Sequence, residues 1–317
     1  MTPDGTPYSD PVADDLTPAQ QEVIDRLGRG AGGEEEYPGE LRASLREELK
    51  EGLEPIARRV DQLFLSKHTI ATALGCEQRY LADEDERFEW DVAKARGTVA
   101  HHAIRLGAAM VGEHSPERRV DEAIGTLMGE RGIGDWLTTC GEATLADLRT
   151  EAITKVAAFD ELWPRLSDRW DPVWEPRIQA AFHDNRIVLS GKPDLTLGRA
   201  KSRVARKVIV DLKTGRHSPD HRSDLRFYAL VETLRVGVPP RILATSYLES
   251  GELHTEVVNE DVLWGQVRRV IDAAGRIATL RAEERDPQRH PGPPCWFCPL
   301  NTTCEPGVDW LSERRDA

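Results

Sequence analysis

An aspartate and a lysine stand two positions apart at the end of an apolar run, VIVDLKTG, residues 208–215. The β-branched residues favour a strand, and in a strand Asp211 and Lys213 point to the same face because side chains alternate with a period of two. Apolar residues on both faces at the start of the run indicate a strand buried between two layers of helices. The acid and base at its end suit a catalytic site, the ordinary alternative being a surface ion pair.

A second aspartate, Asp194 in GKPDL, precedes Asp211 by 17 residues and lies near the end of the preceding predicted strand. Two carboxylates on neighbouring strands supply hard oxygen ligands, which Mg²⁺ and Mn²⁺ prefer. Lys213 beside them could hold a phosphate oxygen or steady an attacking water as charge develops. The residue types therefore predict metal-assisted chemistry at a phosphate group.

These motifs resemble those of a known family. GKPDL followed by DLK resembles the core motif of the PD-(D/E)XK nuclease superfamily. RGTVAHHAI resembles the Gly-x-x-x-His helix of its RecB-like branch and points to His101, four residues after Gly97. DLRFYAL resembles the Gln-x-x-x-Tyr helix of that branch and points to Tyr228, although Asp224 stands at the glutamine position. The resemblance spans residues 66–305.

The resemblance implies a fold and a set of site residues. The implied fold is α/β, with a mixed central sheet flanked by helices as in a restriction-endonuclease-like core, a helical N-terminal region and a C-terminal four-cysteine clasp. One or two Mg²⁺ or Mn²⁺ ions would be held by His101, Asp194, Asp211 and the carbonyl of Leu212, with Lys213 and Tyr228 completing the catalytic set.

Two adjacent histidines follow Gly97, and helical periodicity separates them. The apolar stripe of this helix runs through Val99, Ala103, Leu106 and Met110. His102 lies on the flank of the stripe, whereas His101 points away from it. We therefore expect His101 to be the ligand and His102 to be a packing or surface residue.

Three of the five cysteines lie close together near the C-terminus, at Cys295, Cys298 and Cys304. Because nothing indicates an oxidising compartment, this spacing predicts metal ligation rather than disulfides. The fourth ligand must come from elsewhere, either Cys76 or Cys140. Four thiolates suit zinc as well as an iron–sulfur cluster, so the spacing alone does not name the metal.

The chain is similar here to the CRISPR-associated four-cysteine exonucleases and the AddB-type nucleases, which place one cysteine before the histidine helix and three after the core. The similarity implies Cys76 as the fourth ligand and an iron–sulfur cluster, [4Fe–4S], as the bound group, leaving Cys140 a free thiol. The cluster would join the front and back of the chain. We expect Trp296 and Phe297 to shield it from water.

Composition and charge set the general class. The 317 residues carry a formal net charge of −13, and neither a membrane-spanning run nor a signal peptide is recognisable, so we expect a cytoplasmic protein. Residues 1–38 predict a flexible acidic leader that contains one short helix capped by Thr17. Residues 199–216 hold seven basic residues and one acid, which predicts a phosphate-facing edge beside Asp211, with a solvated loop as the alternative.

Residues 39–317 predict a single nuclease domain. We expect helices over residues 41–64, 66–81, 97–111, 222–235 and 260–285, a helical insert at about 117–170, strands from residue 173 with a hairpin around Gly251, and the cysteine cluster at 295–304.

The sequence thus predicts a metal-dependent DNA nuclease, acting as an exonuclease on single-stranded DNA or DNA ends. The alternative is a non-cleaving DNA-end-binding module of a repair, defence or CRISPR-type complex, which would not require Lys213. No helicase motif is present, so a helicase or another repair or defence protein is the expected partner. Polarity, exonuclease or endonuclease action, and DNA or RNA preference stay open.

Overall fold

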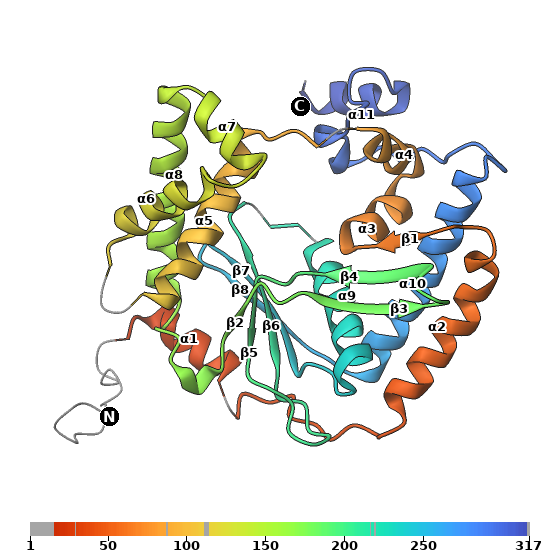
Figure 1. Ribbon diagram of the computed structural model, residues 1–317, viewed down its shortest axis with the longest axis horizontal. Helices are drawn as coiled ribbons and strands as arrows, with labels where there is room; N and C mark the ends of the chain where they lie inside the picture. The colour runs from red at the N-terminus through yellow and green to blue at the C-terminus, as the bar shows by residue number, and fades with distance from the viewer. Residues whose placement is uncertain are drawn as a thin grey trace.

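Two β-sheets form the centre of the protein, and helices cover them on both sides (Figure 1). The computed structural model describes residues 16–28, 30–86, 88–110, 114–215, 217–218 and 220–315. The three-stranded sheet has the order β1 (Leu63–Leu65), β4 (Ile187–Gly191), β3 (Ile178–Phe182). The five-stranded sheet has the order β2 (Val173–Trp174), β5 (Leu195–Leu197), β6 (Val208–Lys213), β7 (Ile242–Tyr247), β8 (Leu253–Val257).

The helices fall into two groups around these sheets. One group, at the left of Figure 1, comprises α1 (Pro18–Leu27), α5 (Val92–Ala109), α6 (Pro116–Leu127), α7 (Ile133–Thr139) and α8 (Glu142–Leu162). The other comprises α2 (Leu41–Ala57), α3 (Lys67–Gly75), α4 (Glu77–Asp85), α9 (Asp220–Val236) and α10 (Glu260–Arg281). The chain closes with α11 (Glu305–Arg315). The predicted α/β class, a mixed sheet arrangement flanked by helices, is confirmed.

β6 lies in the middle of the five-stranded sheet and is buried on both faces. It pairs antiparallel with β5, where Leu195 faces Val210, and parallel with β7. Val208, Val210 and Leu212 point into the core formed with α1 and α5–α8. Ile209 points into the other core, which includes α2, α3, α9 and α10. Asp211 shares the face of Ile209 because the side chains alternate.

Two of the predicted helices end earlier than we expected. The helix predicted over residues 41–64 ends at Ala57, and β1 follows it. Leu63 and Leu65 are fully buried in parallel pairing with β4, so strand pairing outweighs helical periodicity there. The helix predicted over residues 66–81 is interrupted at Cys76, whose backbone is extended, giving α3 and α4.

The described part of the predicted leader packs against the domain. Thr17 caps α1, as expected, by accepting a hydrogen bond from the Gln20 N–H. The Arg241 guanidinium donates hydrogen bonds to the carbonyl oxygens of Leu27, Gly28 and Gly32. Residues 16–28 and 30–38 therefore belong to the packed structure rather than to a flexible leader, while residues 1–15 lie outside the described residues.

The helical insert, expected at about 117–170, also contributes to positioning the site. Its helices α6 and α8 pack against α5, which carries His101. Asp91 caps the N-terminus of α5 by accepting a hydrogen bond from the Lys94 N–H at 2.8 Å. Among the described residues, none of the helices is long and apolar enough to cross a membrane.

Candidate active site

The two predicted aspartates meet at the end of β6. Asp194 immediately precedes β5, which runs antiparallel to β6. Asp194 therefore lies beside the C-terminal end of β6. Its Oδ2 accepts a hydrogen bond from the Leu212 N–H at 2.8 Å. The N–H and C=O of one strand residue point to the same side of the strand, so the Leu212 carbonyl also faces the Asp194 side. Asp194 and Leu212 are therefore neighbours, as their proposed roles require.

His101 reaches the C-terminal end of β6 from α5. Its Nδ1 lies 3.3 Å from Asp194 Oδ1. Burial by itself would lower the pKa of His101, but the nearby Asp194 and Asp211 carboxylates outweigh it and raise that pKa above its ordinary value. The approach of α5 is close, since a Cβ added at Gly97 would stand 3.6 Å from Thr214 Oγ1, just beyond β6.

His102 lies elsewhere. It is buried, and its Nδ1 lies 2.9 Å from a guanidinium nitrogen of Arg105. Burial and then the Arg105 charge lower the pKa of His102. The structure thus brings His101, and not His102, to the aspartates, in the positions that the helical periodicity predicted.

Asp211 is almost completely buried, at 3% exposure, between two lysines. Lys213 Nζ lies 2.7 Å from its Oδ2, and Lys67 Nζ lies 3.2 Å from its Oδ1. Burial would raise the pKa of Asp211, but the two ammonium groups outweigh it and hold the pKa below its ordinary value. The two lysines therefore favour the ionised form of this carboxylate.

Lys67 is a site residue that the sequence analysis missed. Its Nζ also lies 3.3 Å from Asp224 Oδ2 and 5.1 Å from the centre of the Tyr228 ring. Lys67 is the first residue of α3, after the N-cap Ser66. A lysine there opposes the helix dipole, which favours anions at a helix N-terminus. The unfavourable position of a lysine at a helix N-terminus is the feature of the sequence that could have pointed to an acidic partner for Lys67.

Tyr228, predicted from the family helix, supports the chain that leads to Asp194. Its hydroxyl donates a hydrogen bond to the Lys192 carbonyl at 3.3 Å. A Cβ added at Gly191 would stand 2.4 Å from the Tyr228 ring, so only glycine allows this approach. Burial raises the pKa of Tyr228 to about 12, which keeps the hydroxyl a hydrogen-bond donor. Tyr228 thus fixes the turn between β4 and β5.

The donor set at this edge comprises an imidazole, two carboxylates and a backbone carbonyl, and it suits Mg²⁺ or Mn²⁺. Its members are engaged with one another or with lysines, His101 with Asp194 and Asp211 with Lys67 and Lys213. No group of three or more His, Cys, Asp or Glu side chains among the described residues is arranged to hold a metal ion. A divalent ion at this site would compete with Lys67 and Lys213 for the Asp211 carboxylate.

The basic residues predicted to face the site lie at the other end of the strand. Arg199, Lys201 and Arg206 belong to the connection that enters β6 at Val208, whereas Asp211 and Lys213 lie where β6 ends. The expectation of a phosphate-facing edge beside Asp211 was therefore wrong for this segment. A connection between antiparallel strands returns to the start of the next strand, and this places it away from that strand's end.

The cysteines predicted as ligands line a single small cavity. Cys76, Cys295, Cys298 and Cys304 all contribute to its wall, and Cys140 does not. Two of the sulfurs accept weak backbone hydrogen bonds, Cys76 Sγ from the His290 N–H at 3.5 Å and Cys295 Sγ from the Gly292 N–H at 3.4 Å. The four thiols therefore share one cavity, although no three of them are arranged to hold a metal ion among the residues that the structure describes.

The surroundings of this cavity differ from expectation in one respect. Trp296 is 41% exposed and Phe297 is 83% exposed, and neither lines the cavity, so the predicted shielding role was wrong. Both residues lie in the short 3₁₀ helix Pro293–Phe297. The front and back of the chain are joined by Glu77, whose buried carboxylate accepts hydrogen bonds from Arg285 at 2.5 and 2.6 Å.

Comparison with known proteins identifies the family. The model of the PD-(D/E)XK nuclease superfamily matches residues 65–305, so the chain belongs to that superfamily. No curated protein matches the chain.

The solved structures that are similar to the chain include the following two. A "Putative exonuclease" from Eubacterium rectale is 11% identical, with 75% of this chain and 88% of that chain covered and a TM-score of 0.44. The protein SSO0001 is 13% identical, with 65% of this chain and 93% of that chain covered and a TM-score of 0.30.

Proposed function

We propose that this protein is a divalent-metal-dependent DNA nuclease of the RecB-like branch, an exonuclease that acts on single-stranded DNA or DNA ends. The observation that carries the proposal is the convergence of His101, Asp194, Asp211 and Lys213 at one edge of the five-stranded sheet, from separate elements. Superfamily membership supports hydrolysis of a nucleic-acid phosphodiester. Nucleases of this superfamily typically use divalent ions such as Mg²⁺.

Each residue has a defined task in this proposal. A bound divalent ion, held by His101, Asp194, Asp211 and the Leu212 carbonyl, would polarise the phosphate and lower the pKa of a bound water. Lys213, whose Nζ lies 2.7 Å from Asp211 Oδ2, would hold a phosphate oxygen or that water. Tyr228 fixes the turn that carries Asp194, through its hydrogen bond to the Lys192 carbonyl.

The direct test is incubation of the purified chain with end-labelled single-stranded and double-stranded DNA and Mn²⁺. Release of labelled mononucleotides or short fragments from one end is the expected result, and the labelled end from which products first appear reports the polarity. Internal fragments that appear before any end product would identify an endonuclease. Intact substrate with wild-type protein would overturn the proposal.

A non-cleaving DNA-end-binding module is the second candidate, and one observation favours it. Both oxygens of the Asp211 carboxylate are already engaged by lysines, Oδ1 by Lys67 and Oδ2 by Lys213. A site held in this ion-paired form would bind phosphates through its lysines without recruiting a metal. Tight DNA binding without cleavage at any Mg²⁺ or Mn²⁺ concentration would support this candidate over the nuclease.

For the cysteine cavity we propose an iron–sulfur cluster, [4Fe–4S], held by Cys76, Cys295, Cys298 and Cys304. The fit rests on four thiols around one cavity and on backbone N–H donors directed at two of the sulfurs. The cluster would reinforce the Glu77–Arg285 connection between α4 and the C-terminal segment. A similarity to CRISPR-associated four-cysteine and AddB-type nucleases, and a helicase or another repair or defence protein as partner, belong to the same proposal.

The cluster is tested on protein purified without oxygen. We expect a brown protein that contains iron and sulfide, and loss of the colour in Cys76→Ser. Cys140→Ser is the matched control and should stay brown, because Cys140 lies outside the cavity. Colourless protein with one stoichiometric zinc would replace the cluster with a zinc site and leave the nuclease proposal standing.

A further inference from the structure

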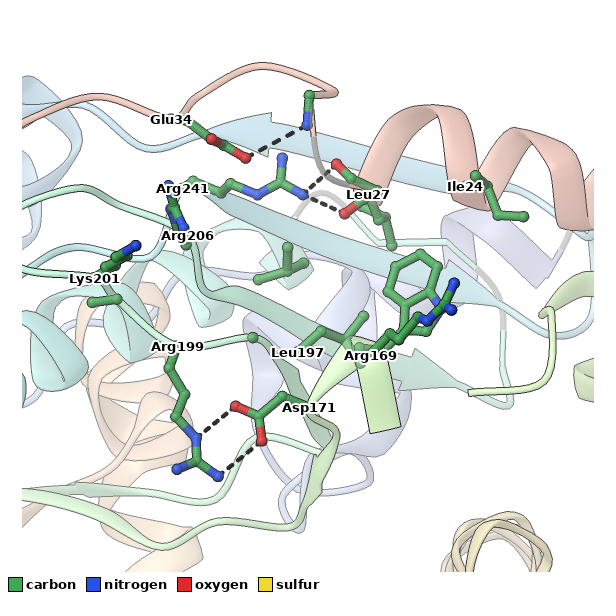
Figure 2. Close-up of a pocket in the computed structure, with 16 residues that line it drawn as sticks. Ile24, Leu27, Glu34, Arg169, Asp171, Leu197, Arg199, Lys201, Arg206 and Arg241 are labelled. Atoms are coloured by element: carbon green, nitrogen blue, oxygen red, sulfur yellow. Dashed lines mark hydrogen bonds and ion pairs between the residues drawn. The ribbon is translucent and has the colours of Figure 1, made fainter. Parts of the chain in front are cut away.

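A second charged site lies at the opposite end of β6 from the candidate active site. A pocket there is lined by residues of α1, of the glycine-containing turn after it, of the segment before β2, and of the β5–β6 connection (Figure 2). Val208 lines this pocket, while Lys213 ends the same strand at the candidate active site. At about 3.3 Å per residue, the two ends are separated by about 16 Å along the strand.

Cations dominate the rim of this pocket, which we call the distal basic pocket. Its basic lining residues are Arg169, Arg199, Lys201, Arg206 and Arg241. Only two acids join them, Glu34 and Asp171. Figure 2 shows Lys201, Arg206 and Arg241 on one side, Arg169 across the pocket from them, and Arg199 paired with Asp171 below.

The structure uses some of these cations internally and leaves others available. Arg241 is committed to the carbonyls of Leu27, Gly28 and Gly32, and it thereby holds one wall of the pocket. Arg199 is committed to Asp171 at 2.5 Å. Lys201 and Arg206 are exposed, and their side chains have no acidic partner among the residues that the structure describes. These two carry uncompensated charge at the mouth.

The interior of the pocket is apolar and includes an aromatic ring. Ile24 and Trp170 are half-buried and line it together with Leu27, Leu197 and Val208, which are at most 2% exposed. The Trp170 carbonyl accepts a hydrogen bond from the Gly198 N–H at 2.7 Å, which ties this segment to the end of β5. The cavity volume is about 1280 Å³. Pockets for small ligands span about 300–1,000 Å³, so this one has room for a segment of a chain molecule.

We propose that the distal basic pocket binds a short segment of single-stranded DNA. Sites for single strands combine a cationic groove for the backbone with aromatic and apolar surfaces for the bases, because every base has a stacking face. Lys201 and Arg206, which are exposed, contact the phosphates, and the half-buried Trp170 with Ile24 beside it receives a base. The inference rests on the proposed function only for the identity of the polymer as DNA.

The pocket would act as an anchor remote from the reacting phosphate. A strand held at the start of β6 stays associated with the protein while its end is cut at the other end of β6. Anchoring of this kind raises the affinity for long substrates and leaves the chemistry at Asp211 and Lys213 unchanged. It therefore predicts an effect on binding that depends on substrate length.

The test measures binding of fluorescein-labelled oligo(dT) by anisotropy in EDTA, over a series of salt concentrations. The double variant Lys201→Glu/Arg206→Glu should bind at least about tenfold more weakly at low salt. Its plot of log affinity against log salt should be shallower by about 1.4, the value for two lost phosphate contacts on a single strand. The matched control Lys50→Glu/Arg58→Glu changes the net charge equally on exposed positions at α2 and should stay within about twofold of wild type.

A second pair of variants tests the aromatic contact. Trp170→Ala should weaken oligo(dT) binding by about five- to hundredfold, whereas Trp170→Phe should retain most of it, because the stacking face is preserved. A circular-dichroism melt on each variant separates loss of stacking from loss of folding. Equal, strong weakening by Phe and Ala with intact folding would contradict a stacking role.

The outcomes separate this inference from the proposed function. Loss of oligo(dT) binding in Lys201→Glu/Arg206→Glu, with cleavage of a very short oligonucleotide retained at saturation, supports both. If the variant loses oligo(dT) binding and the wild-type protein cleaves no DNA, the proposed binding pocket stands and the proposed nuclease function is overturned. Unchanged affinity and salt slope in that variant overturn the pocket. Binding of poly-glutamate by the wild type and by the same variant is measured as well. If the variant loses poly-glutamate binding but keeps oligo(dT) binding, the DNA assignment is overturned and the pocket is assigned to an acidic peptide.

Discussion

The two ends of β6 each carry a cluster of charges, and the clusters are built in opposite ways. At the C-terminal end, Asp211 is buried and contacted by Lys213 and Lys67, and each of these three side chains has an oppositely charged partner within 3.2 Å. At the N-terminal end, Lys201 and Arg206 are exposed and have no acidic partner among the described residues. The same strand therefore supports a compensated cluster and an uncompensated one.

The difference shows what each cluster can do. Buried, paired charges interact strongly at short range, shift each other's pKa and hold a fixed geometry, as a reaction requires. Exposed, unpaired charges act through a field that salt screens within about 10 Å, as a binding surface for a polyanion requires. Variants at the two ends should therefore fail in different ways.

The largest expected effect is on cleavage at the compensated end. Asp211→Asn and Lys213→Ala should each reduce cleavage of labelled DNA by at least about a thousandfold, because one removes a metal ligand and the other a phosphate or water contact. Arg206→Ala, at the other end of β6, should keep the rate on short substrates. A comparable loss in Arg206→Ala would remove the distinction between the two ends.

The adjacent histidines provide the next test. His101→Ala should reduce cleavage by about a hundredfold, since it removes the imidazole 3.3 Å from Asp194. His102→Ala should keep most of the activity and lower the melting temperature instead, because His102 is a buried packing residue. The opposite pattern, with His102→Ala inactive and His101→Ala active, would reassign the ligand.

The pH dependence should follow His101. Its pKa is raised above the ordinary value of 6.5, mainly because the Asp194 carboxylate outweighs burial, so the proton is retained to a higher pH. Imidazole binds a metal only when neutral, so the affinity for Mn²⁺ should fall as the pH is lowered through the raised pKa of His101. Electron paramagnetic resonance of free Mn²⁺ measures this affinity at each pH. His101→Gln should weaken the dependence of affinity on pH, and an equally steep dependence in that variant would contradict the assignment.

The smallest expected effect concerns Lys67. Lys67→Met should tighten Mn²⁺ binding by about two- to fivefold, since it removes a cation 3.2 Å from Asp211 that competes with the ion. Lys67→Arg keeps the charge and is the matched control. Weaker Mn²⁺ binding in Lys67→Met, with the fold intact, would show instead that Lys67 positions the carboxylate for the metal.

The sequence alone was sufficient for the local features of the site. The alternation in residues 208–213 predicted the buried strand and put Asp211 and Lys213 on one face, which the structure has. Helical periodicity separated His101 from His102, and the cap at Thr17 was recognisable from its neighbours. Each of these depends on residues within one or two turns, where backbone geometry fixes the side-chain directions.

Only the tertiary structure decided the contacts between distant residues that neither a local pattern nor the family resemblance indicated. Lys67 contacts Asp211 across 144 positions of sequence, and no local pattern encodes that pair. The direction of the basic connection after β5, away from the aspartates, follows from the antiparallel pairing of β5 with β6. The Arg241 guanidinium binds the carbonyl oxygen of Leu27 at the end of α1. Part of the segment that we expected to be a leader therefore lines the distal basic pocket. These outcomes depend on how separate elements pair and pack, which is a property of the whole chain and not of any one segment.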